Sequence, residues 1–454
     1  MVTDRYTGRR FAPARAGLAV RCVLVAAPLL LGGCGEKATL PENATTGPTP
    51  VLVSPRQTLV PTVNIAPAVG WPEGVRPRAA PGLAVSAYAT GLDHPRWLHV
   101  LPNGDVLVAE TAAPRFHDAP GGLKAWVAGR IMSTAGAGKP SADRITLLRG
   151  VRPDGRAELQ TVLLRGLHSP FGMAHVGSYL YVANTDAVVR FPYSIGDTAI
   201  AAASVKVLDL PGGPIDYHWT KDLVASPEGT HLYVSVGSNS NVGENGLDNE
   251  VGRAAIHEID LATGRSRVFA SGLRNPNGLA WEPRTGTLWC TVNERDELGS
   301  DLVPDYMTAV RDGGFYGWPY SYFGQHVDAR VQPPRPDLVA RAIVPDYALG
   351  AHTASLGLAF YEAEALPDRY RGGAFIGQHG SWNRKPLSGY KVVFVPFAGG
   401  RPAGPPEDVL TGFLSPDGKA YGRPVGVAVD STGALLVADD VGNVIWRVTR
   451  QPTP

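Results

Sequence analysis

A repeated phrase constrains the fold of this chain more than any other feature of its sequence. Each copy combines Gly-Leu or a similar start, a few polar residues and a proline with a glycine turn and a β-branched strand. Six copies begin near Gly91, Gly166, His218, Gly272, His352 and Gly422. Because repeats of one supersecondary unit bury their apolar faces by stacking, the chain is predicted to contain six stacked units.

Each unit has the pattern of a small antiparallel sheet. Runs with period-two alternation are joined by turns such as Asn103-Gly104 and Thr285-Gly286, which are typical of β-hairpins. Four strands in roughly 50–70 residues match one blade of a β-propeller. The sequence therefore predicts an all-β fold, a six-bladed β-propeller with four-stranded antiparallel blades.

The N-terminus has the features of an export signal. A basic stretch precedes the short apolar run Cys22–Leu31, which is followed by Gly32-Gly33-Cys34. The run is too short to cross a bilayer core of about 30 Å. We predict a lipoprotein signal peptide at residues 1–33 and lipidation at Cys34. An ordinary signal peptide or an uncleaved anchor is the alternative.

Residues 34–80 are rich in proline and have no helical period. This composition predicts a semi-extended tether, followed by the propeller at residues 81–454. The protein is then expected to be exported and anchored by lipid to the periplasmic or extracellular face of a membrane. Cys290 would be the remaining cysteine of the mature chain, and we expect it to be a small buried apolar residue.

Charge and motifs exclude several functions. The 42 basic residues balance the 41 acidic ones, so no nucleic-acid partner is expected. A glycine-rich phosphate loop, a Cys-x-x-Cys pair, zinc-type histidine spacing and a Gly-x-Ser-x-Gly elbow are all missing from the sequence. These absences argue against nicotinamide, zinc and serine-hydrolase chemistry.

Polar residues recur where each repeat enters its first strand. In a propeller the innermost strands line the axis, and loops at one end of that axis build the site. We therefore expect these residues to meet at one mouth of the axis: Arg96, His168, His218, Arg274 with Asn275, His352 and Arg423.

Two of these positions suit catalysis. The imidazole of His218 can accept a proton near neutral pH, although it could equally be a structural histidine at a blade edge. Arg274 offers a fixed fork of donors for a carboxylate, and Asn275 adds a donor and an acceptor. A salt bridge between blades is the alternative for Arg274, and both interpretations also apply to Arg423.

An acidic loop, Asn293–Asp301, follows a predicted inner strand. It holds four carboxylates and a glycine, which suits a hard cation such as Ca²⁺. A solvated acidic loop is the alternative.

Four motifs, in this order, resemble the glucose/sorbosone dehydrogenase family. They are the His218 phrase before Leu-Tyr-Val-Ser-Val-Gly, the stretch Gly-Leu-Arg-Asn-Pro-Asn-Gly-Leu-Ala, the loop Asn-Glu-Arg-Asp and the turn Tyr-Gly-Trp-Pro. The members are soluble sugar dehydrogenases that bind pyrroloquinoline quinone (PQQ) and Ca²⁺ on six blades. The likeness covers roughly Leu83 to Val448 and looks closest to the L-sorbosone dehydrogenase branch.

The resemblance implies roles for individual residues. His218 would be the general base, and Arg274 would polarise the quinone carbonyl that receives hydride. Catalytic Ca²⁺ would be held by the loop that contains Asn293 and Glu294. The implied cofactor-binding residues are Asn275, His352, Thr353, Lys385, Tyr421 and Arg423. The positions where the family binds structural Ca²⁺ are Glu297, Asp301 and Tyr316.

The chain departs from the family pattern at two places. Asn293-Glu294-Arg295 stands where glucose-oxidising members have Gln-Gly-Pro, and Tyr421 stands where they have a second arginine. Lys385 could supply the missing cation. Substrate choice would depend on loop residues, for which the candidates are Arg96, Trp97, Trp219 and Trp382.

The expected function is a PQQ- and Ca²⁺-dependent dehydrogenase that oxidises a sugar, a sugar aldehyde or a polyol. Electrons would pass to a quinone or cytochrome at the membrane. One alternative is a Ca²⁺-dependent lactonase-type hydrolase on six blades. Another is a non-catalytic propeller that binds carbohydrate or protein.

Overall fold

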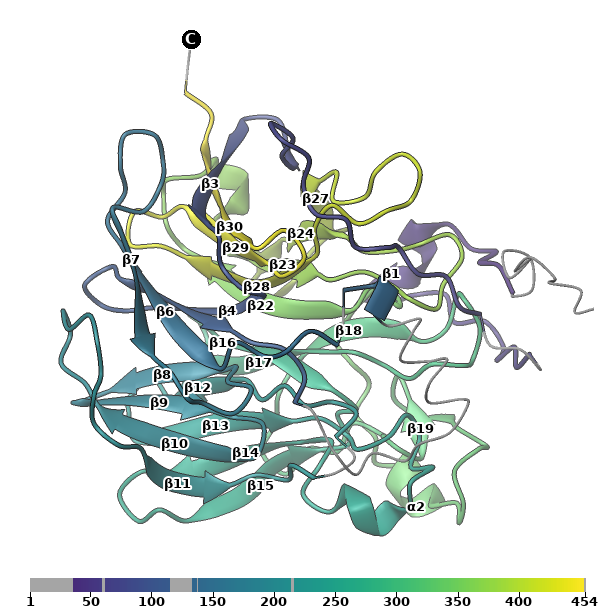
Figure 1. Ribbon diagram of the computed structural model, residues 1–454. Helices are drawn as coiled ribbons and strands as arrows, with labels where there is room; N and C mark the ends of the chain where they lie inside the picture. The colour runs from purple at the N-terminus through teal and green to yellow at the C-terminus, as the bar shows by residue number, and fades with distance from the viewer. Residues whose placement is uncertain (1–35, 59–61, 115–132, 137, 214–215, 453–454) are drawn as a thin grey trace, which may run out of the picture. The chain divides into compact units, whose positions relative to one another are not determined.

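A computed structural model describes residues 36–58, 62–114, 133–136, 138–213 and 216–452. Six antiparallel sheets form a ring, which confirms the predicted six-bladed β-propeller (Figure 1). The first strands of the six sheets contact one another around the axis. None of the helices in these ranges has the length and apolarity needed to span a lipid bilayer.

The first three blades have four strands each, which follow one another from the axis outward. Blade 1 comprises β4 (Pro95–Val100), β5 (Val106–Glu110), β6 (Arg144–Arg149) and β7 (Leu159–Leu164). Blade 2 comprises β8 (Met173–Val176), β9 (Tyr179–Ala183), β10 (Ala187–Pro192) and β11 (Val205–Asp209). Blade 3 comprises β12 (Leu223–Ala225), β13 (His231–Val236), β14 (Ala255–Asp260) and β15 (Ser266–Ser271).

The next two blades have five strands. Blade 4 comprises β16 (Pro276–Glu282), β17 (Thr287–Val292), β18 (Pro304–Ala309), β21 (Tyr347–Ala351) and β1 (Thr46–Gly47). Blade 5 comprises β22 (Ser355–Tyr361), β23 (Gly373–Gln378), β24 (Lys391–Val395), β27 (Glu407–Thr411) and β2 (Arg78–Ala79). Blade 6 again has four strands, β28 (Pro424–Val429), β29 (Leu435–Asp439), β30 (Val444–Arg450) and β3 (Leu83–Thr90).

Short elements decorate the loops. They are the hairpins β19 (Ser321–Tyr322) with β20 (His326–Val327) and β25 (Phe397–Ala398) with β26 (Arg401–Pro402), helix α2 (Pro336–Val339), and the 3₁₀ turns η1 (Glu42–Thr45), η2 (Leu247–Glu250) and η3 (Asp368–Tyr370).

Blade 6 joins the two ends of the propeller. Strand β3 pairs antiparallel with β30, from Leu83 opposite Arg450 to Thr90 opposite Val444. Figure 1 shows β3, coloured as an early segment, beside the yellow β30. The ring is thus closed by backbone hydrogen bonds between strands from the two ends of the propeller sequence.

The glycine of the repeated phrase lies where neighbouring inner strands approach each other. A Cβ atom on Gly426 of blade 6 would lie 2.7 Å from the carbonyl oxygen of Arg96 in blade 1. A Cβ atom on Gly278 would come even closer to the carbonyl oxygen of Leu356 in the next blade. The glycine recurs in the repeat because adjacent blades pack closely at this position, and a side chain there would separate them.

The segment predicted as a tether lies against the propeller where it is described. We call residues 36–58 and 62–80 the N-terminal arm. It adds β1 to blade 4 and β2 to blade 5, and Trp71 donates its indole N–H to Asp439 at 2.7 Å. The arm therefore has structural contacts that composition did not predict, and a spacing role at a membrane stays a prediction. Cys290 is buried, as predicted.

Candidate functional site

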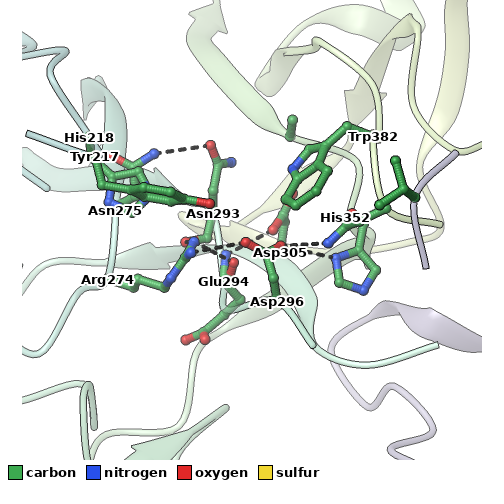
Figure 2. Close-up of a pocket in the computed structure, with 13 residues that line it drawn as sticks. Tyr217, His218, Arg274, Asn275, Asn293, Glu294, Asp296, Asp305, His352 and Trp382 are labelled. Atoms are coloured by element: carbon green, nitrogen blue, oxygen red, sulfur yellow. Dashed lines mark hydrogen bonds and ion pairs between the residues drawn. The ribbon is translucent and has the colours of Figure 1, made fainter. Parts of the chain in front are cut away.

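A cavity of about 430 Å³ opens at the mouth of blades 3, 4 and 5 (Figure 2). Seven residues singled out from the sequence line it: His218, Arg274, Asn275, Asn293, Glu294, His352 and Trp382. Topology explains this convergence. In each blade the start of the inner strand lies beside the end of the second strand, because the two are antiparallel.

His218 precedes the inner strand β12 and is held as a neutral base. Its Nδ1 lies 2.9 Å from the carbonyl oxygen of Ser238, an atom that can only accept, so Nδ1 carries the proton. Burial, reinforced by the nearby charge of Arg274, holds the pKa of His218 well below its ordinary value. Nε2 therefore keeps a free lone pair at neutral pH.

Arg274 forms hydrogen bonds to two of the loops that surround the cavity. Its guanidinium donates to the carbonyl oxygens of Asn241 at 3.2 Å and Glu294 at 2.6 Å. It also donates to the side chains of Asn241 at 2.9 Å and Asp296 at 3.1 Å. Arg274 thus fixes the loop after β17, and donation to a bound molecule would replace one of these bonds.

Carboxylates form one side of the cavity. Asp296 accepts from Asn383 at 2.7 Å and lies 3.7 Å from Nδ1 of His352. Burial alone would raise the pKa of Asp296, but Arg274 and His352 outweigh it and lower that pKa to about 2. In return, Asp296 outweighs the burial of His352 and raises the pKa of that imidazole. Burial raises the pKa of Asp305 to about 6.

Two residues that line the cavity each carry a buried side-chain oxygen with no hydrogen-bond partner among the described residues. These oxygens are Oδ1 of Asn275 and Oε1 of Glu294. A buried acceptor without a partner carries a desolvation cost, which a bound donor or cation would remove. Both oxygens are therefore unsatisfied acceptors next to the cavity, and the other carboxylate oxygen of Glu294 pairs with Arg295 at 3.0 Å.

Aromatic side chains flank the opening. Figure 2 shows Tyr217 beside His218 on one side and Trp382 above His352 on the other. Tyr217 is 51% exposed, and the guanidinium of Arg274 lies 5.9 Å from the centre of its ring. The opening thus presents aromatic faces suited to a planar or sugar ligand.

Several residues predicted to bind a cofactor lie outside this lining. Thr353 is adjacent to His352 and donates to Asp305 at 3.2 Å. Arg423, before β28, donates to the carbonyl oxygen of Ala66 in the arm at 3.3 Å. The ring of Tyr421 contacts Trp71, and the carbonyl of Lys385 accepts from Ala38.

The residues predicted for structural Ca²⁺ have separate partners. Glu297 has a largely exposed side chain that faces Arg330 at 3.9 Å. Asp301 accepts the backbone N–H of Thr39 at 2.6 Å, and Tyr316 donates to the carbonyl oxygen of Ala309 at 2.6 Å. Within the described part of the chain, no group of three or more His, Cys, Asp or Glu side chains is arranged to hold a metal. Cys34 lies outside the described residues.

Of the candidate substrate-loop residues, only Trp382 lines the cavity. Arg96 pairs with Asp440 and lies over the ring of Trp219 at 5.6 Å. Trp97 stacks on Phe171 at 4.4 Å. Arg96, Trp97 and Phe171 lie where the chain enters blades 1 and 2, and Asp440 follows β29 of the last blade, whereas Trp219 directly follows His218 before blade 3.

Sequence comparison identifies the family. The pattern of the TrAA12-like family matches residues 157–308 and 339–451, which is more than half of the chain. The chain belongs to the TrAA12-like family. The matched ranges contain His218, Arg274, Asn293 and His352, and leave out the N-terminal arm.

Other relatives of this TrAA12-like chain include an uncharacterized protein of Borreliella burgdorferi, which is 28% identical over 63% of this chain and 77% of its own. A pyrroloquinoline quinone-dependent pyranose dehydrogenase of Coprinopsis cinerea is 25% identical over 52% of this chain, but the match spans only 40% of that protein. An aldose sugar dehydrogenase of Escherichia coli is 28% identical over 25% of this chain and 29% of its own.

Solved structures share the fold of the TrAA12-like chain. The holo form of the PQQ domain of the Coprinopsis cinerea pyranose dehydrogenase superposes with a TM-score of 0.65 at 20% identity, over 85% of this chain and 99% of that domain. A calcium structure of a Trichoderma reesei enzyme of family AA12 gives a TM-score of 0.66 at 19% identity, over 86% of this chain and 99% of that one.

Sequence reasoning missed several lining residues of this TrAA12-like site. Asp296 lies inside the acidic loop that was considered only as a whole, and its place in that loop was the available signal. Asp305 lies at the start of β18, and Tyr217 precedes His218. Val63 comes from the arm, where no periodic pattern points to the cavity.

Proposed function

We propose that this chain is a PQQ- and Ca²⁺-dependent dehydrogenase that oxidises a sugar, a sugar aldehyde or a polyol. One observation carries the proposal: a neutral imidazole at His218 and an oxygen-rich wall at Glu294 line the same cavity. Support also comes from the TrAA12-like family and from relatives named as PQQ-dependent pyranose dehydrogenase and aldose sugar dehydrogenase.

The cavity fits a planar, oxygen-rich cofactor with a hard cation. Its volume falls within the range of small-molecule sites, and Tyr217 and Trp382 offer flat faces. The unpartnered oxygen of Asn275 suits a donor, and Oε1 of Glu294, whose neighbouring oxygen pairs with Arg295 at 3.0 Å, is an oxygen of the kind that a hard cation takes. Oxygen is the ligand that Ca²⁺ takes in proteins.

In this proposal Ca²⁺ would be held by oxygens of Asn293 and Glu294, and the quinone would lie against Asn275. When bound, the quinone supplies a hydride acceptor and the cation a Lewis acid. Arg274 positions the loop that carries both Asn293 and Glu294 through its bonds to their carbonyl oxygens.

His218 performs the proton transfer. Its Nε2 accepts the proton of a substrate hydroxyl, while Nδ1 keeps its bond to Ser238. The positive charge that then forms on the ring is destabilised by burial and by Arg274. The same destabilisation favours return of the proton to solvent, so His218 is neutral again for the next substrate.

The finer features are proposals as well. We place the activity in the L-sorbosone dehydrogenase branch, with electrons passing to a quinone or cytochrome at a membrane. Export and lipidation at Cys34 would bring the protein to that membrane.

Cofactor reconstitution tests the proposal. Purified protein is incubated with PQQ and Ca²⁺, and dye reduction is followed with a panel of aldoses, sorbosone and polyols. We expect dye reduction that depends on sugar, quinone and Ca²⁺ together. Lactone hydrolysis without quinone would point instead to the lactonase-type alternative, and sugar binding without either reaction to a non-catalytic propeller.

A further inference from the structure

A second, smaller cavity adjoins the first. It has a volume of about 200 Å³ and shares Trp382 and Asn383 with the cavity that holds His218. Its other lining residues come from the N-terminal arm and from the loops of blade 4. They include Glu36, Arg56, Gln57, Glu297 and Arg330.

The arm builds one side of this second cavity and is fixed to the propeller there. Glu36 accepts the backbone N–H of Ser300 at 2.6 Å, and the hydroxyl of Ser300 donates back to the carbonyl oxygen of Glu36 at 3.0 Å. The backbone N–H of Arg56 donates to Leu298 at 2.9 Å. The hydroxyl of Thr62 donates to the carbonyl oxygen of Glu36 at 3.2 Å. This wall is therefore a built part of the fold.

The lining offers both donors and acceptors. Arg56 pairs with Glu36 at 3.3 Å, yet its side chain is 51% exposed, so further N–H groups can reach a ligand. The largely exposed carboxylate of Glu297 lies 3.9 Å from Arg330, which is beyond hydrogen-bond length. Each hydroxyl of a sugar ring can both donate and accept, so a mixed lining of this kind matches a sugar better than an apolar or singly charged ligand.

We propose that this cavity is a second sugar subsite, which binds the neighbouring unit of a disaccharide or longer saccharide while the terminal unit occupies the first cavity. The proposal rests on the sugar dehydrogenase function and specifies its substrate class. Trp382 stands between the two units and contacts both. The arm residues of this subsite lie outside the ranges that match the family, whereas Glu297, Trp382 and Asn383 lie inside them.

Binding without cofactor tests the subsite. Glucose, cellobiose and maltose are titrated into the full chain by calorimetry, and into the variants Arg56→Ala and Gln57→Ala. Arg76→Ala is the matched control, an exposed arginine of the same arm that does not line the cavity. Circular dichroism verifies that each variant is folded.

We expect at least one disaccharide to bind the wild type more tightly than glucose. Arg56→Ala should weaken disaccharide binding about tenfold, as loss of one charge-assisted hydrogen bond implies, and leave glucose binding unchanged. Gln57→Ala should act in the same direction with a smaller effect, and Arg76→Ala should change neither.

Two results would overturn the subsite: equal affinity of the wild type for glucose and both disaccharides, or equal weakening of all three sugars by Arg56→Ala. The outcome is independent of catalysis, because no quinone is present. If dye reduction fails but the wild type still binds a disaccharide more tightly than glucose, the dehydrogenase function is refuted and the saccharide-binding subsite is retained.

Discussion

His218 combines a fixed tautomer with a depressed proton affinity. The carbonyl oxygen of Ser238 holds the proton on Nδ1, and burial disfavours a second proton on Nε2. A histidine in water has a pKa of about 6.5, so its ring is half protonated at pH 6.5. His218 instead stays available as a base into mildly acidic solution.

The pH dependence of turnover should reflect this shift. In the proposed mechanism the active form is the neutral ring, and its folded pKa lies below 6.5, so activity should be retained as pH falls through 6.5 and lost only below it. We expect the acidic limb of kcat/KM for the reconstituted enzyme to lie below pH 6.5. An acidic limb at or above pH 7 would contradict the neutral-base assignment.

Removal of the imidazole gives a second test. His218→Ala should lower kcat by roughly 10²-fold or more, while PQQ binding followed by absorbance persists, because a general base acts only in the reaction step. His326→Ala is the control, since this histidine lies on the exposed hairpin strand β20. Wild-type turnover in His218→Ala would remove it from the mechanism.

The central residues of the site could be predicted because they occupy the repeated polar position before an inner strand. His218, Arg274 and His352 follow from that rule and from antiparallel topology alone. Asp305 and Val63 could not be found in this way. Asp305 lies at the start of a third strand, and Val63 reaches the cavity only through contacts between the arm and distant loops.

At the scale of the strand, blade spacing depends on the inner-strand glycines. A Cβ atom placed on Gly426 would lie 2.7 Å from the carbonyl oxygen of Arg96, across the boundary between blades 6 and 1. A backbone atom cannot rotate away as a flexible side chain would. A methyl group here therefore requires the two blades to separate.

Gly426→Ala should destabilise the fold by about 1–3 kcal/mol, the usual cost of overpacking. Urea denaturation measures the loss. Gly213→Ala is the matched control, because a Cβ atom there would meet nothing within 4 Å and its backbone has no positive φ. Equal stabilities for the two variants would show that the close approach at Gly426 is relieved without cost.

The strands themselves could be predicted from the sequence, but β1 and β2 could not. Both are two residues long and lie in a proline-rich segment whose composition indicates an extended linker. Their pairing depends on the exposed edges of blades 4 and 5, which accept an added strand wherever the arm passes. The local sequence of the arm therefore does not indicate which blade edge each of these short strands pairs with.

At the scale of the whole molecule, stability depends on the closure of blade 6. Val85 of β3 is buried and pairs with Val448 of β30, whereas the neighbouring Ala84 points to the other, partly exposed face. Val85→Asp should destabilise the propeller by about 3 kcal/mol or more, because it buries an unpaired charge. Ala84→Asp should cost much less.

Urea denaturation of both variants checks this expectation. Because the ring is closed only at this blade, loss of β3 pairing should lower the midpoint of the whole transition rather than produce a separate early step. An unchanged midpoint for Val85→Asp would show that the other sheets hold the ring without β3.

The pairing of β3 with β30 also has a kinetic consequence. A ribosome delivers β3 among the first propeller strands and β30 last, so the earliest strand must wait for the final one. Contacts between such distant residues give a high contact order, which slows folding. Until β30 has been synthesised, β3 presents an open strand edge, so nascent chains of this protein need protection from aggregation while the propeller strands are being made.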